Sequence, residues 1–321
     1  MEESSLFITP EILQTALEVG LIYSLVALSL FVSFSILDIC DLSTDGCYTL
    51  GCAVGAVVTM SGHPVLALVA GMAAGVCSGF VTALLQTRFH VQSILAGIIV
   101  NTGLYTINLA VMGFSSNYPI FGKPTVFSLI KGVGKSTQWK GWSPLLLLAV
   151  LLALICLALR WFLSTRLGLS IRATGDSPAM VRASSINPAF TITVGLCVAN
   201  AMTGLAGALV GQYNKTSDIN LGTGMVTIAL ASLIIGESFS KKSQNMLWKI
   251  ISVVLGSCLY RVIISLALRL NVPTEAFKLV SALIVCVAII APQTKEMVSF
   301  ERKKHAGMAG HVRNKDTEGR Q

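Results

Sequence analysis

The feature that most constrains the fold is a series of long apolar runs, each close to the length of a membrane-spanning helix. A helix that crosses a bilayer needs roughly 20 predominantly apolar residues. Of the 321 residues, 54% are hydrophobic and only 12% are charged, against about 25% charged in typical soluble domains. So little charge cannot cover a water-soluble surface. The sequence therefore predicts an integral membrane protein.

The apolar runs predict an all-α, polytopic membrane protein with about 8–10 transmembrane helices. The expected spans are residues 12–37, 46–60, 64–86, 92–113, 143–163, 189–211, 223–239, 247–268 and 276–292. The first is too long for a cleaved signal peptide. The second and seventh are short for a full crossing. We expect them to be half-helices packed inside the protein, where interrupted backbone at membrane depth is tolerated.

The distribution of Lys and Arg predicts the orientation. Cytoplasmic connections carry an excess of these residues, and the connection 164–188 contains Arg166, Arg172 and Arg182. With this loop in the cytoplasm, the N-terminus lies outside, the loop 114–142 outside and the C-terminus inside. Residues 1–292 then form one membrane domain, and 293–321 a basic cytoplasmic tail that we expect to be disordered. The net charge of +8 reflects this topology and not nucleic-acid binding.

A weak internal repeat supports a transport function. The apolar run that begins at Gly20 is followed by a polar break, 38–46, and a short stretch rich in small residues. The run 190–211 is followed by a similar break, 214–222, and another such stretch. On the expected topology the two units have opposite orientations. Inverted repeats with interrupted helices are typical of transporters, with the pathway at the interface of the repeats.

Polar residues inside or between the spans are candidates for the pathway, because such groups are costly in lipid. Asp41 is expected to cap the second helix, whereas the role of Asp45 stays open. We expect Arg261 to form an ion pair with Glu237, with exposure to a pathway as the alternative. Asn101 and Asn108 suit hydrogen bonds between helices. The candidate pathway residues are Asp41, Asp45, Asn101, Asn108, Glu237 and Arg261.

Other patterns argue against catalysis or metal binding by this chain. The eight cysteines are scattered and form no C-x-x-C pair, and the four histidines show no ligand spacing. Residues 131–136 resemble the end of a phosphate-binding P-loop, but Leu129 stands where the full pattern needs Gly. We therefore expect no catalytic residue, no metal and no cofactor in this chain, and ATP only on a partner subunit.

The segment 167–187 predicts a short amphipathic helix outside the membrane. Asp176 or Ser177 can cap it, Pro178 suits its first turn, and Met180 and Ile186 supply apolar side chains. A helix this short is marginal alone and needs a partner. The segment is expected to dock a soluble subunit.

Three sequence blocks, 171–176, 183–187 and 204–209, resemble the coupling region of the branched-chain amino acid and ribose permease family of ABC importers. The break at 41–46 and the segment 104–109 resemble a subgroup of tryptophan/tyrosine-type permeases. The similarity extends over residues 11–292, although Ser184 and Ser185 depart from the family pattern. The resemblance implies a type II importer fold and contact of the following residues with an ATPase: Arg172, Thr174, Gly175, Asp176, Met180, Arg182 and Ile186.

The predicted function is that of a permease subunit in a bacterial cell membrane. The resemblance implies an ABC ATPase, an extracytoplasmic solute-binding protein and a second permease copy as partners, with an amino acid or similar small solute as cargo. The alternative is a secondary transporter driven by an ion gradient, which the inverted repeat and the intramembrane charges also fit.

Overall fold

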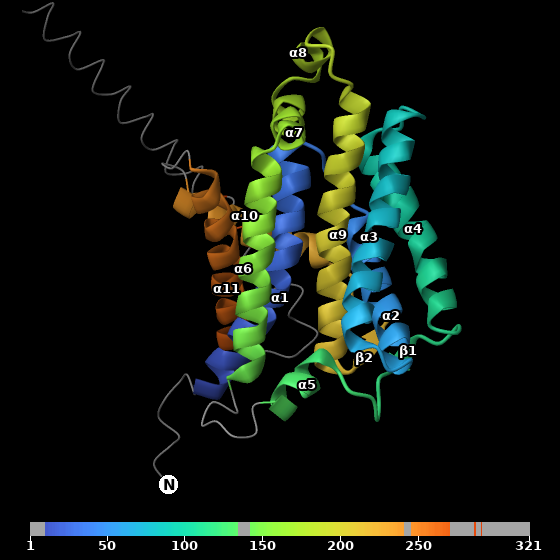
Figure 1. Cartoon of the computed structure of the whole chain (residues 1–321), viewed down its shortest axis with the longest axis vertical. Helices are drawn as coiled ribbons and strands as arrows, with labels where there is room; N and C mark the ends of the chain where they lie inside the picture. Colours follow the sequence, from blue (N-terminus) through green and yellow to red (C-terminus); the bar gives the residue numbers. More distant parts are fainter. Residues whose placement is uncertain (1–9, 134–141, 241–244, 270–285, 287–289, 291–321) are drawn as a thin grey trace, which may run out of the picture.

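The described part of the chain is almost entirely helical. The computed structural model describes residues 10–133, 142–240, 245–269, 286 and 290 (Figure 1). The helices are α1 (Pro10–Leu30), the π-helix η1 (Phe31–Ile36), α2 (Thr44–Met60), α3 (Pro64–Thr87), α4 (Ser93–Val111), α5 (Val126–Val133), α6 (Ser143–Ser164), α7 (Arg166–Asp176), α8 (Pro178–Ala183), α9 (Pro188–Asn214), α10 (Met225–Ser240) and α11 (Met246–Arg269). Two short strands, β1 (Asn117–Pro119) and β2 (Thr216–Asp218), pair antiparallel.

Six helices of the described part are long and apolar enough to cross a membrane. They are α1 continued by η1, α3, α4, α6, α9 and α11. Each coincides closely with a predicted span, and the all-α polytopic fold is confirmed. The two spans predicted to be short are α2 and α10, with 17 and 16 residues. The ninth predicted span and the basic tail lie outside the described residues, apart from positions 286 and 290.

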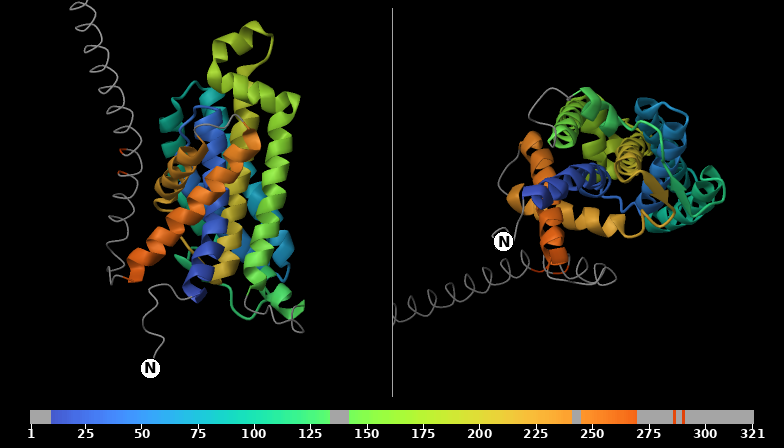
Figure 2. Two further views of the ribbon diagram at one scale, coloured as in Figure 1. Left: turned by 90° about the vertical axis from the view of Figure 1, so that its left-hand side faces the viewer. Right: turned by 90° about the horizontal axis from the view of Figure 1, so that it is seen from below.

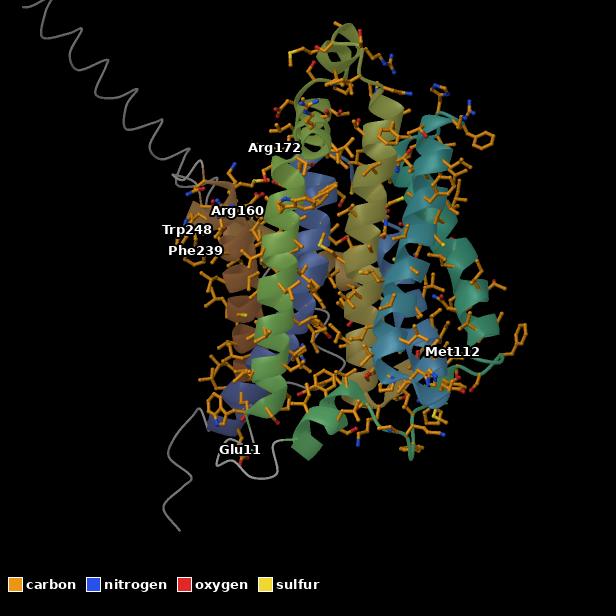
Figure 3. All side chains as sticks on the ribbon, viewed as in Figure 1. Glu11, Met112, Arg160, Arg172, Phe239 and Trp248 are labelled. Carbon is orange, nitrogen blue, oxygen red and sulfur yellow. The ribbon has the colours of Figure 1, made fainter. Side chains whose placement is uncertain are left out.

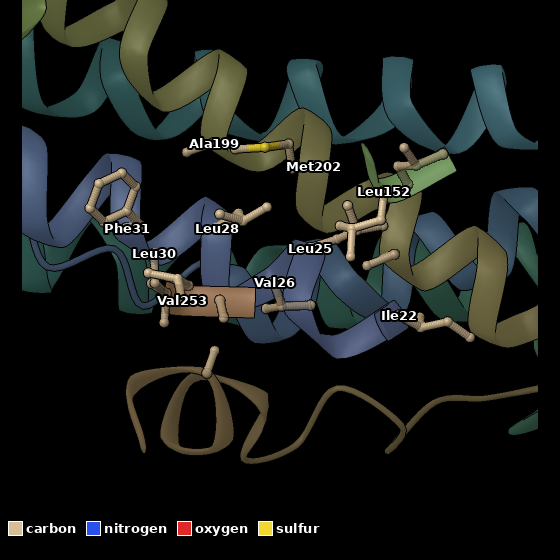
Figure 4. Close-up of a cluster of buried hydrophobic side chains, with 14 of the residues drawn as sticks. Ile22, Leu25, Val26, Leu28, Leu30, Phe31, Leu152, Ala199, Met202 and Val253 are labelled. Atoms are coloured by element: carbon tan, nitrogen blue, oxygen red, sulfur yellow. The ribbon is translucent and has the colours of Figure 1, made fainter. Parts of the chain in front are cut away.

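Helix α1 lies at the centre of the bundle. Its buried side chains include Ile22, Val26 and Leu28, and they pack against α6, α9 and α11. Figure 4 shows this cluster, with Leu152 of α6, Met202 of α9 and Val253 of α11 around the α1 side chains. A helix that is apolar all round is a buried helix. In the most apolar part of each span, 78% of α1 with η1 is buried inside the protein, against 17% of α6.

Small residues allow α2, α3 and α9 to pack with their backbones in contact. A Cβ atom on Gly204 of α9 would overlap the carbonyl oxygen of Gly71 on α3, and one on Gly51 of α2 would overlap that of Gly204. Gly75 meets the backbone of Asn200 in the same way. These glycines thus form the contact surface of the three helices, as is usual for small residues between helices in membranes.

The two ends of the bundle differ. At one end, called the α8 end, α7 lies across the bundle and α8 lies beyond it (Figure 2). At the other, called the sheet end, β1, β2 and α5 cover the helices (Figure 1). The predicted loop 114–142 is partly folded, because β1 and α5 belong to it. Neither strand was predicted.

The short helices α2 and α10 begin beside each other inside the bundle and run in opposite directions. From this junction α2 leads to the sheet end, where the Cys52 thiol lies 3.9 Å from the carbonyl oxygen of Thr216 in β2. Helix α10 leads away toward the α8 end, where Ser35 donates to Glu237 at 2.6 Å. The long helices that precede them, α1 and α9, are also antiparallel (Figure 1). This arrangement matches the inverted repeat inferred from the two polar breaks.

Candidate functional site

Asp45 joins the starts of the two short helices. It lies in the first turn of α2, and its carboxylate accepts hydrogen bonds from the backbone N–H groups of Gly224 at 3.0 Å and Val226 at 2.8 Å. Asp45 therefore caps α10, a helix 180 residues further along the chain. A carboxylate is stabilised at a helix N-terminus both by the free N–H groups and by the helix dipole. The second helix break is attached at the same place, because Thr49 accepts from the N–H of Gly222 at 3.1 Å.

A polar cavity of about 330 Å³ opens at this junction. Helix α4 contributes a stripe of polar side chains with helical spacing, and the break before α10 contributes the opposite wall. The cavity, called the junction cavity, is lined by Asp45, Gly46, Thr49, Asn101, Thr102, Tyr105, Asn108, Ile219, Asn220, Gly222 and Thr223. Three of the six predicted pathway residues, Asp45, Asn101 and Asn108, are thus brought together.

The side chains of α4 hold the cavity wall against α2. Asn108 donates to the carbonyl oxygen of Gly46 at 3.1 Å, and a Cβ atom on Gly46 would lie 2.6 Å from Asn101 Oδ1. Tyr105 is 53% exposed in the single chain. The lining offers amide, hydroxyl and carboxylate groups and includes no Lys or Arg. Chemically, such a surface suits a small polar solute that exchanges hydrogen bonds with water for hydrogen bonds with the wall.

Asp41 does not line this cavity and instead connects the first break to α9. Its carboxylate accepts from the backbone and hydroxyl of Ser43 at 2.8 and 2.6 Å and from the Asn200 amide at 2.7 Å. Asp41 is 1% exposed and fastens the first break to α9. It does not cap α2 with its side chain as expected, since the N-cap residue of α2 is Ser43 and no side-chain cap bond is present there.

Glu237 and Arg261 do not form the expected ion pair in the described part of the chain. Glu237 accepts from Ser35 near the α8 end, whereas the Arg261 guanidinium lies 5.2 Å from the centre of the Tyr23 ring. Gly236, the neighbour of Glu237, packs on Ser252 and Val253 of α11. Arg261 lies on the same helix, more than two turns beyond Val253, and is therefore not beside Glu237. A cation over an aromatic face is stabilised by the ring quadrupole. Neither residue lines the junction cavity.

Glu18 is a buried carboxylate that the sequence analysis missed. It lies within the α1 span and is 5% exposed, and it accepts hydrogen bonds from Gln14 and Tyr213 at 2.8 Å each. The signal was present, since an acidic residue within an apolar run is expensive and marks a candidate site. Tyr213, however, is 195 residues away in the sequence, so the partner could not be recognised.

The predicted coupling segment forms α7 and α8. The Ser177 hydroxyl accepts from the N–H of Met180 at 3.4 Å, and Pro178 occupies the first turn, as predicted. Among the predicted contact residues, Met180 is 59% exposed. Arg172, Asp176 and Arg182 are also exposed and Ile186 is half-buried; Figure 3 shows Arg172 at the α8 end.

Thr174 and Gly175 face the bundle and not the surface. The Thr174 hydroxyl lies 2.8 Å from that of Thr191 in α9, and Thr174 is 2% exposed. A Cβ atom on Gly175 would overlap the carbonyl oxygen of Ile36, the last residue of η1. Both residues therefore connect α7 to the helices below it, and the expectation that they touch a partner directly is not supported by their positions.

Comparisons with known proteins identify the family. Residues 12–289 match the model of the family described as the permease component of the branched-chain amino acid transport system. The tyrosine transport system permease protein of Clostridioides difficile (strain R20291) is 32% identical over 274 residues, which cover 85% of this chain and 88% of that protein.

Two further relatives carry other substrates in their names. The guanosine ABC transporter permease protein NupP of Bacillus subtilis (strain 168) is 24% identical over 76% of this chain and 70% of its own length. The ribose import permease protein RbsC of Escherichia coli (strain K12) is 24% identical over 80% and 78%, respectively. No solved structure is significantly similar to the chain.

Proposed function

Since this chain belongs to the branched-chain amino acid transport system permease family, we propose that it forms the translocation pathway of a bacterial ABC importer for a free amino acid. The chain is a multi-pass membrane subunit without a catalytic domain, and membership implies a separate ATPase and a solute-binding protein. The amino acid is favoured because the relative with 32% identity is a tyrosine permease.

The observation that carries the proposal is the junction cavity. Solute sites of membrane transporters lie where discontinuous helices meet, with helix N-termini turned toward the site. Here the starts of α2 and α10 meet at Asp45, and polar groups of α4 line the adjoining space. We assign Asp45, Asn101 and Asn108 to the pathway. Asp41, Glu237 and Arg261 support neighbouring helices in this proposal.

The same proposal assigns α8 as the docking helix for the ATPase. Its support is the exposed side chains of Met180 and Arg182 on α8. The exposed charges of Arg172 and Asp176 on the preceding helix α7, and the adjoining Ile186, extend this surface. Thr174 and Gly175 then transmit force from α7 to α9 and η1. The α8 end is cytoplasmic in this proposal, the sheet end faces the solute-binding protein, and a second copy of the chain completes the pathway.

Uptake by reconstituted vesicles tests the function. The permease, its co-expressed ATPase and the solute-binding protein are placed in proteoliposomes with labelled L-tyrosine. We expect uptake that needs internal ATP and the binding protein. Uptake in ATP-depleted vesicles under a sodium or proton gradient would contradict the proposal and favour an ion-driven transporter.

Docking is tested by the double variant Asp176→Arg/Met180→Asp. Reversing one charge and placing another on the exposed apolar contact is expected to abolish co-purification of the ATPase and ATP-driven uptake. Phe114→Asp, at an exposed apolar position of the sheet end (74% exposed), serves as the control and retains the ATPase. Unchanged co-purification in the double variant would show that α8 is not the docking helix.

A further inference from the structure

A second cavity, separate from the junction cavity, lies at the sheet end beneath α5. Its volume is about 340 Å³, and it is lined by Glu18, Thr125, Phe127, Ser128, Pro144, Gln212, Tyr213 and Lys215. We call it the α5 cavity. The described residues that line it are all different from those that line the junction cavity. Pockets that bind small molecules start at about this size.

The buried wall of the α5 cavity holds a carboxylate that is hydrogen-bonded to two neutral side chains. Glu18 is 5% exposed, and among the residues that the structure describes its hydrogen-bond donors are the neutral groups of Gln14 and Tyr213. No ion pair to Glu18 is found in the described part of the chain. A buried charge is costly unless it is paired, and each carboxylate oxygen still has a lone pair to offer. The wall is therefore suited to a cationic group that enters the cavity.

The opposite charge is supplied at the sheet end by Lys215. This residue ends α9 with a left-handed backbone (φ 57°), and its side chain is exposed. Glu18 and Lys215 are the two charged groups among the described residues that line the cavity. One buried negative group and one exposed positive group complement a solute that carries both charges.

Aromatic rings form another part of the wall. Phe127 and Tyr213 meet edge to face, with ring centroids 5.5 Å apart, and Pro144 adds an apolar surface. Gln212 fixes this arrangement, because its amide accepts from the N–H of Val126 at 2.9 Å and donates to the carbonyl oxygen of Pro64 at 2.8 Å. The Gln212 amide thus holds the start of α5 over the cavity. Such walls bury an apolar or aromatic side chain of a ligand.

From this combination we propose that the α5 cavity binds a free α-amino acid with an aromatic or large apolar side chain. Its ammonium group contacts Glu18, its carboxylate contacts Lys215, and its side chain packs on Phe127 and Tyr213. The inference rests on the proposed function, in which the sheet end lies outside the cell. The α5 cavity then receives the solute before the solute reaches the junction cavity.

Equilibrium binding to the full chain in lipid nanodiscs tests the proposal. The probes are labelled L-tyrosine and L-leucine, with tyramine (no carboxylate) and 3-(4-hydroxyphenyl)propanoate (no ammonium) as competitors. We expect at least one of the amino acids to bind and each competitor to bind at least tenfold more weakly than L-tyrosine. Absence of binding by both amino acids would overturn the proposal.

Two variants assign the charges. Glu18→Gln keeps a hydrogen-bond acceptor for Tyr213. We expect it to weaken the binding of tyrosine and of tyramine at least tenfold and to leave the binding of the propanoate unchanged. Lys215→Gln is expected to weaken the binding of tyrosine and of the propanoate and to leave the binding of tyramine unchanged. Asp218→Asn, at a carboxylate of the sheet end that accepts from the N–H of Asn220, is the matched control.

The outcomes separate this inference from the proposed function. Tyrosine binding that survives Glu18→Gln and is lost in Asp45→Asn would place the solute in the junction cavity and overturn the inference, while ATP-driven uptake still upholds the function. Phe127→Leu replaces the aromatic ring with another apolar side chain and provides a check on folding. We expect it to weaken the binding of tyrosine more than the binding of leucine. Equal weakening of both would contradict an aromatic wall.

Discussion

At the scale of single residues, the position of Asp45 explains why a carboxylate is present between two apolar helices. Its two backbone partners belong to the start of α10, so one side chain holds both interrupted segments together. The sequence identified Asp45, Asn101 and Asn108 as costly polar groups in an apolar setting. It could not give their partners, because the partner of Asp45 is a backbone 180 residues away, which no local pattern encodes.

Replacing Asp45 is expected to impair uptake. Loss of a capping side chain costs about 0.5–2 kcal/mol, and about 1.4 kcal/mol corresponds to tenfold in an equilibrium. Asp45→Ala should therefore reduce the rate of ATP-driven uptake about tenfold, and Asp45→Asn should reduce it less because one acceptor oxygen remains. The measurement is initial uptake per molecule of permease in the membrane.

The matched control is Asp38→Asn, an exposed acid in the same break with a left-handed backbone (φ 56°) that Asn also adopts readily. Its uptake should equal that of the unmodified protein. Equal uptake by the Asp38 and Asp45 variants would mean that the bridge to α10 is not needed for transport.

At the scale of elements, eight predicted spans correspond to helices, including the two that were expected to be short. Long apolar runs and their breakers decide these boundaries, since a helix is the structure that satisfies its own backbone in lipid. The elements that were missed or left unresolved are short: β1, β2 and α5. They form through contacts with distant segments, such as the pairing of Tyr118 with Ser217, which hydropathy does not reveal.

The contact among α2, α3 and α9 yields a stability prediction. Gly204→Val would force side-chain atoms into the carbonyl of Gly71, which cannot move away without shifting α3. Overpacking of a tight contact typically lowers the free energy of unfolding by about 1–3 kcal/mol. Because the contact here is with backbone, we expect a loss at the upper end of this range. We expect a clear fall in melting temperature and in the yield of monodisperse protein in detergent.

Gly103→Ala is the control for this prediction. Gly103 lies in α4, and a Cβ atom there meets nothing within 4 Å. Ala also has a higher helix propensity than Gly by roughly 1 kcal/mol. The Gly103 variant should therefore melt at the same temperature or higher, and a comparable loss in both variants would refute the packing argument.

At the scale of the whole molecule, the junction cavity is open on one side of the single chain. Thr102 and Tyr105 of α4 are exposed beside it, and a polar wall that faced lipid would be costly. This is the physical reason to expect a second copy against α4. In the sequence analysis, the second permease copy was implied by the family resemblance alone. A pattern in one chain does not show which helix face is covered by a neighbouring copy.

The mass of the permease in nanodiscs checks this expectation. Two copies give a protein mass of twice 34.0 kDa, and Tyr105→Asp, which charges the exposed wall, should reduce the dimer fraction. Phe80→Asp, at an exposed apolar position of α3, indicates how much any added charge disturbs insertion. A monomeric mass for the unmodified protein in the presence of its ATPase would contradict the paired arrangement.

The convergence of α2 and α10 on Asp45 also bears on electrical insulation. Each helix start carries about half a positive charge, so the two together offset most of the single negative charge of the carboxylate between them. The centre of the polar passage is then nearly neutral. In the proposed importer, an ion driven by the membrane voltage therefore finds no fixed charge there to follow.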